Sequence, residues 1–151
     1  MTYEELLIHS DNEGLKVKEK NIRGNDGRIN GNRIAIRRGI PETQKACVLA
    51  EELGHHYTTV GNILNQELDA NRKQELHARM WAYNRMIGLS GIVKCYKAGY
   101  KTLHDMAEYM SVTENFLAEA LERYRQKYGE CIHFDNYAIY FEPNLQVLEI
   151  L

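Results

Sequence analysis

The spacing of the apolar residues changes at Pro41, and this change constrains the fold more than any other feature of the chain. Before Pro41, apolar and polar residues alternate along Leu15–Lys18 and Arg33–Arg37, as they do in strands with one buried face. After Pro41, apolar residues recur at helical spacing, first along Lys45–His56. Strands and helices that occupy separate stretches of a chain are typical of the α+β class. We therefore expect an α+β fold.

Turn and capping residues divide the chain into individual elements. A short helix should end near Gly14, and turn residues at 25–27 and 30–32 separate the strands of a small antiparallel sheet. The remaining elements are expected to be helices over 45–56, 69–87, 89–98, 103–109 and 114–127, then a hairpin over 131–141. Thr113 should cap the last helix. We find no repeat, so the 151 residues are predicted to form one domain.

The charges are unevenly distributed. The whole chain has 19 basic and 21 acidic residues, a net charge of −2, which argues against a strongly basic nucleic-acid-binding protein. The segment Lys16–Arg38 alone carries +6, so the rest of the chain carries −8. Alternating Lys and Arg residues on strands are most simply one solvated face of a sheet. Their functional interpretation is a docking surface for an acidic partner.

The sequence also predicts a cellular compartment. The first residues are acidic and lack the basic and apolar regions of a signal peptide. The longest run without Asp, Glu, Lys or Arg, Leu53–Gln66, is too short and too polar to span a bilayer. Cys47, Cys95 and Cys131 lie far apart and are expected to be buried, reduced thiols. We therefore expect a cytoplasmic protein without membrane contacts.

The helix that follows Pro41 carries a candidate metal site. Glu51 and His55 lie four residues apart, so both side chains can reach one ion from the same helix face. Glu52 lies further round the helix, where it can contact a metal-bound water without being a ligand. This is the geometry of the H-E-x-x-H helix of zinc hydrolases, with Glu51 in the place of the first His. The alternative interpretation is that Glu51 and Glu52 are solvated acids on the exposed face of the helix.

A catalytic zinc needs a third protein ligand. On the next predicted helix, Glu75, Ala78 and Ala82 share one face. The two small alanines would let this helix pack closely on the first, so that Glu75 can reach the metal. Two carboxylates beside one imidazole shift the preference from Zn²⁺ toward harder ions such as Mn²⁺ or Fe²⁺. A competing register pairs Glu52 with His56 and makes Glu51 the base.

Most of the chain resembles the ImmA/IrrE metallopeptidases, which phages and integrative elements carry and which also act as bacterial stress regulators. The resemblance rests on Lys45–His56 and on Gln74-Glu75-x-x-Ala78-x-x-Trp81-Ala82. It implies a minimal zincin-like fold with an active-site helix, a C-terminal helical pair and a C-terminal hairpin. It also implies a metallo-endopeptidase that cleaves a phage or mobile-element repressor in the cytoplasm and so induces gene expression.

The resemblance further implies His55 and Glu75 as metal ligands, Glu52 as general base, and Glu51 at the remaining ligand position. Because Glu51 replaces a His of the family, a catalytically impaired anti-repressor adaptor stays as an alternative. In zincin-type sites, an edge strand beside the metal helix often aligns an extended substrate by adding it to the sheet. Our candidate for this strand is Arg33-Ile34-Ala35-Ile36-Arg37. Tyr57 follows the motif and can either stabilise a tetrahedral intermediate or pack.

A second class of function is a DNA-binding helix-turn-helix at about residues 101–128. A recognition helix presents basic residues in its first turns, whereas Glu114 and Glu119 stand there. Residues 101–127 hold four bases and five acids, which argues against direct nucleic-acid binding through this segment. The preferred interpretation is a packed helical pair, with a buried stripe formed by Phe116, Leu117, Ala120 and Leu121.

Overall fold

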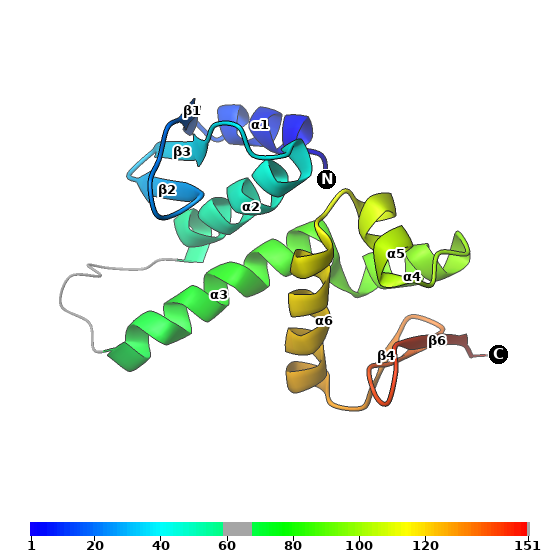
Figure 1. The fold of residues 1–151 in the computed structure, drawn as a ribbon. Coiled ribbons are helices and arrows are strands. Elements are labelled where there is room, and N and C mark those ends of the chain that lie inside the picture. The colour runs from blue at the N-terminus through cyan, green and yellow to red at the C-terminus, as the bar shows by residue number, and fades with distance from the viewer. Residues whose placement is uncertain (59–67, 151) are drawn as a thin grey trace. The chain divides into compact units, whose positions relative to one another are not determined.

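The computed structural model describes residues 1–58 and 68–150, and its α+β class is the predicted one (Figure 1). The chain divides into two compact units, Met1–Arg85 and Met86–Leu151. Each unit contains helices and one three-stranded sheet. This division does not test whether the whole chain forms a single domain, so that expectation stays a prediction.

The first unit contains the elements that position the candidate site. They are α1 (Tyr3–Asn12), β1 (Lys16–Lys20), β2 (Gly27–Asn30), β3 (Arg33–Arg37), α2 (Glu42–Thr58) and α3 (Leu68–Met86). Thr2 caps α1, because its hydroxyl accepts a hydrogen bond from the Glu5 amide at 3.2 Å. All of these elements were predicted from the sequence to within a few residues, because caps, turns and periodicity are local signals.

The strand order of this sheet corrects two predictions. The order is β1-β3-β2, and β1 runs parallel to β3 whereas β2 runs antiparallel to it. The expected all-antiparallel sheet is therefore wrong for β1. The chain leaves β1, forms the far strand β2, and returns through the tight turn at Gly31 into the gap between them. Because Arg33–Arg37 has a neighbour on both sides, it is not the edge strand that we expected.

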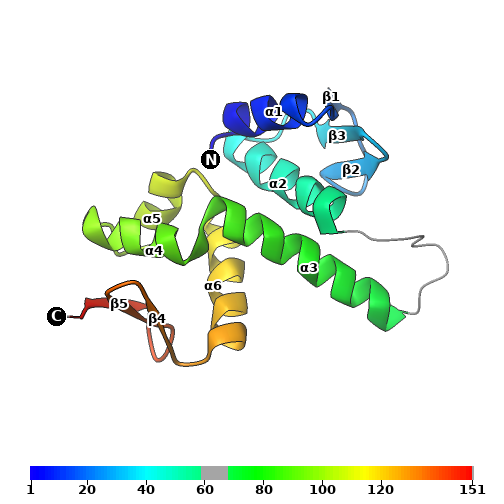
Figure 2. The same ribbon diagram turned by 180° about the vertical axis from the view of Figure 1, so that it is seen from behind.

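The two faces of this sheet differ in composition. The face covered by α1 and α2 carries Val17, Ile29, Ile34 and Ile36, of which the last two are buried. The other face is exposed and carries most of the Lys and Arg side chains of the strands. The views from both sides show α1 and α2 beside the small sheet (Figures 1 and 2). The alternating pattern thus correctly predicts one buried and one solvated face.

The second unit contains α4 (Gly88–Lys97), α5 (Leu103–Met110), α6 (Glu114–Tyr128), β4 (Cys131–Phe134), β5 (Tyr137–Tyr140) and β6 (Gln146–Glu149). The predicted cap of α6 is confirmed, because the Thr113 hydroxyl accepts from the Phe116 amide at 3.1 Å. The predicted hairpin is part of a larger antiparallel sheet with the order β4-β5-β6. β6 was missed because Val147 is its one buried residue, too weak a pattern to indicate a strand.

Side-chain burial in the second unit corrects two further expectations. Phe116, Leu117 and Ala120 are buried as predicted, but the fourth position of the stripe is Tyr124 rather than the half-buried Leu121.

Of the three cysteines, Cys47 and Cys95 are buried as expected, whereas Cys131 is half-buried on the first strand of its sheet. Among the described helices, none combines the length and apolar character that crossing a bilayer requires.

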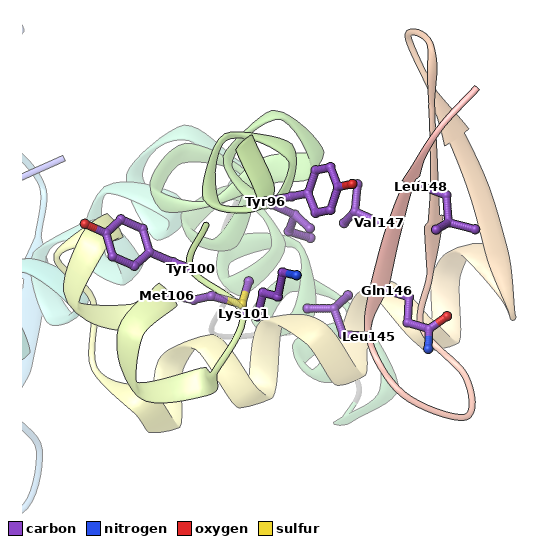
Figure 3. A pocket seen from close by; sticks show the side chains of 9 residues that line it. Tyr96, Tyr100, Lys101, Met106, Leu145, Gln146, Val147 and Leu148 are labelled. Carbon is purple, nitrogen blue, oxygen red and sulfur yellow. The ribbon is translucent and has the colours of Figure 1, made fainter. Parts of the chain in front are cut away.

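A groove of about 380 Å³ lies within the second unit (Figure 3). It runs between the end of α4, the start of α5 and the segment that contains β6. Tyr96, Met106 and Val147 contribute to its apolar lining, and Lys101 also lines it, next to Met106. The groove is separate from the predicted metal-binding residues, all of which belong to the first unit.

Candidate metal centre

Two small residues let α2 and α3 cross at short distance. Gly54 on α2 and Ala78 on α3 are both buried, and so is Ala82 one turn further along. A β-carbon at position 54 would lie 2.9 Å from the Ala78 carbonyl carbon and closer still to its oxygen. The predicted close packing through the alanine face of the second helix is therefore confirmed. Gly54 is the complementary residue on α2 that sequence reasoning did not single out.

This crossing brings His55 and Glu75 together. His55 Nε2 lies 3.2 Å from Glu75 Oε2, although the residues belong to different helices and are 20 positions apart. Two ligands of one tetrahedral zinc, each at 2.0–2.2 Å from the ion, lie about 3.4 Å apart. The observed distance thus fits two ligands of one metal. It also fits an ion pair, and Arg79 Nε lies 3.3 Å from the other carboxylate oxygen of Glu75.

Glu52 lies beside this pair and faces a hollow of about 510 Å³. His55, His56 and the strand residues Gly27 and Arg28 also line the hollow. Burial, together with the smaller effect of the charges of Glu51 and Glu75, raises the pKa of Glu52 to about 7. A carboxyl group poised near neutral pH is suited to accept and return a proton.

Gly27 explains how β2 approaches this carboxyl group. A β-carbon at position 27 would lie 2.5 Å from Val48 Cγ1 and 3.1 Å from Glu52 Oε1. A side chain at this position would therefore collide with α2 and push the strand away from it. The strand next to Glu52 is thus β2, which is an edge strand. Arg33–Arg37 also packs against α2, and its role in aligning a substrate stays a prediction. The turn signal Asn25-Asp26-Gly27 was present, but it did not reveal which strand would pass the helix.

One protein-family model matches most of the chain. The model of the peptidase family M78, described as the IrrE N-terminal-like domain, matches residues 13–122. The chain belongs to this family. Membership implies a metal-dependent peptidase of the IrrE/ImmA type, and the matched range includes both helices of the site. No curated protein and no solved structure matches the chain, so the zincin-like fold stays a prediction.

Within this IrrE-type domain, Glu51 is half-buried on α2 next to Glu52. Its charge acts on Glu52, but the structure does not gather it with His55 and Glu75. In the described part of the chain, one set of three side chains has ligand atoms all within 4.8 Å of one another, namely His104, Asp105 and Glu108 on α5. All three are exposed, and exposed acidic groups of this kind are common without a metal. The family site therefore remains the candidate centre.

Tyr57 of this IrrE-type domain has a packing role in the structure. Its ring stacks on Trp81 with the ring centroids 5.0 Å apart, and its hydroxyl forms a 2.9 Å hydrogen bond with Nε2 of His9. His9 lies on α1, so this contact connects the first helix to α2 and α3. No local pattern in the sequence indicates a contact between two residues 48 positions apart. A role of Tyr57 in stabilising an intermediate stays a prediction.

Proposed function

We propose that this M78-family protein is a metal-dependent endopeptidase that cleaves a repressor protein of a phage or mobile element in the cytoplasm. The observation that carries the proposal is the 3.2 Å approach of His55 and Glu75 from two helices, with Glu52 facing the adjoining hollow. A ligand pair beside a half-buried carboxyl group is part of the arrangement that metal-assisted peptide hydrolysis requires. Cleavage of the repressor would release the genes that it silences.

In this proposal His55 and Glu75 hold the metal, and Glu51 is the third ligand that the sequence predicts. When bound, the metal polarises the scissile carbonyl and makes a water molecule more acidic. Glu52 accepts the proton of the attacking water and passes it to the departing amine nitrogen. Zn²⁺ is the expected ion, and the two carboxylates leave Mn²⁺ and Fe²⁺ as competitors.

The substrate is proposed to lie along β2 rather than along Arg33–Arg37. β2 is paired with β3 on one side, so its other side can form main-chain hydrogen bonds with an extended peptide. Because Gly27 lacks a side chain, a peptide on this strand can approach Glu52 closely. The flexible region of a repressor that links its domains would suit this mode, since it can become extended without unfolding a core.

The test combines metal analysis with cleavage of the repressor encoded beside the protein. Glu75→Gln should lose most of the bound metal, whereas Glu52→Gln should keep it and cleave about 10²–10⁴-fold more slowly. Glu108→Gln is the matched control, because it removes an exposed carboxylate from the set His104, Asp105 and Glu108, which does not belong to the candidate site. This variant should keep both the metal and the activity. Equal cleavage by the wild type and Glu52→Gln would refute the assignment of the base.

A second pair of variants separates the two possible registers of the motif. If Glu51 and His55 are ligands, Glu51→Gln should lose metal and Glu52→Gln should not. If Glu52 and His56 are the ligands, the two variants should exchange their behaviour. A protein that binds the repressor tightly and holds metal, but leaves every tested repressor intact, would instead be the catalytically impaired adaptor.

A further inference from the structure

The strand register gathers the basic residues of the first unit on one face of its sheet. Lys16 pairs with Arg33 and Lys18 with Ala35 between β1 and β3, and Arg28 pairs with Ala35 between β2 and β3. Paired residues point to the same side of a sheet. The side opposite the helices therefore presents a basic sheet face, formed by Lys16, Lys18, Lys20, Arg28 and Arg33.

These five cations lack acidic partners. In residues 1–58 and 68–150, no carboxylate lies within 4.0 Å of any of them. Arg37 is the register partner of Lys20 and lies on the same side of the sheet, but Asp26 neutralises it at 3.3 Å, so it is not counted among the five. Lys45, on α2, pairs with Glu19. The five side chains are all exposed, and they surround a shallow hollow of about 360 Å³.

The spacing of these charges favours an extended polyanion. Alternate residues of a strand lie about 6.6 Å apart and neighbouring strands about 4.8 Å apart, so each cation has others within one Debye length. Their mutual repulsion is relieved most effectively by a ligand that carries closely and regularly spaced negative charges. A nucleic-acid backbone has this property, because duplex DNA carries one charge per roughly 1.7 Å of its axis.

The composition of the face favours a nucleic acid over a protein. Stable protein interfaces have aromatic or apolar anchors at their centre, whereas Ala35 and Asn30 are the non-basic residues of these strands on this side. The absence of aromatic side chains from the described face also disfavours single strands, whose bases stack on aromatic rings. The features that remain suit the backbone of a duplex.

We propose that the basic sheet face binds the phosphate backbone of duplex nucleic acid without sequence specificity. The sequence argued against nucleic-acid binding from the whole-chain charge and from residues 101–127, and neither argument concerns this face. The acidic residues elsewhere have little effect on it, because salt screens charges beyond about 8–10 Å under physiological conditions. The proposal does not depend on peptidase activity, so the inactive Glu52→Gln variant should bind equally well.

The test measures binding of the full chain to a fluorescent 20-base-pair duplex by anisotropy over a series of salt concentrations. If all five cations contact phosphates, the logarithm of the binding constant should fall with the logarithm of salt concentration at a slope near −4.5. Removing two of them with Lys16→Gln/Lys18→Gln should reduce this slope by about 1.8. The matched control is Lys94→Gln/Lys101→Gln, which removes two exposed lysines from the second unit and should leave binding unchanged.

A second double variant on the same face, Lys20→Gln/Arg33→Gln, should show the same reduction in the salt slope. Agreement between the two double variants shows that the reduction does not come from a folding defect in one of them. The proposal is overturned if the duplex does not bind at 50 mM salt, or if both pairs bind it as tightly as the wild type does. It is also overturned if a poly-glutamate peptide displaces the duplex at equal charge concentration. That outcome would assign the face to an acidic protein.

Discussion

The close crossing of α2 and α3 predicts that Gly54→Ala will reduce stability and metal binding together. The new methyl group would lie 2.9 Å from the Ala78 carbonyl carbon, whereas ordinary contacts begin near 3.4 Å. The helices must therefore separate by at least about half an ångström at a point where both backbones are buried. Overpacking of this kind costs about 1–3 kcal/mol.

Part of this cost is offset, because replacing glycine by alanine within a helix stabilises it by about 1 kcal/mol. We expect a net loss in the free energy of unfolding of up to about 2 kcal/mol, which corresponds to a melting temperature lower by up to roughly 8 °C. The same separation moves Glu75 away from His55, so zinc affinity measured by calorimetry should also fall.

Gly91→Ala is the matched control for this experiment. Gly91 also lies within a helix, but a β-carbon there would meet the flexible Met110 side chain, whose Sδ lies 3.2 Å away. The side chain can adjust, so this variant should be neutral or more stable by up to about 1 kcal/mol. If Gly54→Ala melts at or above the temperature of the wild type and retains full zinc affinity, our interpretation of the helix crossing is refuted.

Three further predictions concern protonation, capping and thiol reactivity. In metal-free protein, the folded state holds the Glu52 proton up to about pH 7 and the unfolded chain releases it near pH 4.5, so stability falls as the pH rises between these values. Glu52→Gln should remove this fall and, after allowance for partial exposure, be about 1–2 kcal/mol more stable than the wild type in urea titrations at pH 8. Thr113→Ala removes the cap of α6 and should cost about 1 kcal/mol in the same titrations; an unchanged midpoint would contradict the capping bond. Burial raises the pKa of Cys95 to about 11, so a thiol reagent should modify the half-buried Cys131 first, as peptide mapping can establish.

Much of the candidate site could be predicted because its signals are local. Helical periodicity places Glu75, Ala78 and Ala82 on one face, and the structure uses this face against α2. The approach of Glu75 to His55 follows from that packing. The position of Glu51 relative to His55 and Glu75 could not be predicted from the helical spacing. The directions of side chains around a metal depend on the whole ligand set and not on spacing alone.

The amino-acid sequence by itself determined every helix, most of the strands, the Thr113 cap of α6 and the buried face of the first sheet, because all of these depend on residues within a few positions of one another. Tertiary structure alone decided the strand order, which put Arg33–Arg37 at the centre of its sheet and β2 beside Glu52. It also decided the contact between His9 and Tyr57 and the gathering of five cations without acidic partners on one face. The physical reason is common to these cases. An alternating strand has the same pattern at the centre or the edge of a sheet, so its neighbours are selected only when distant segments pack together.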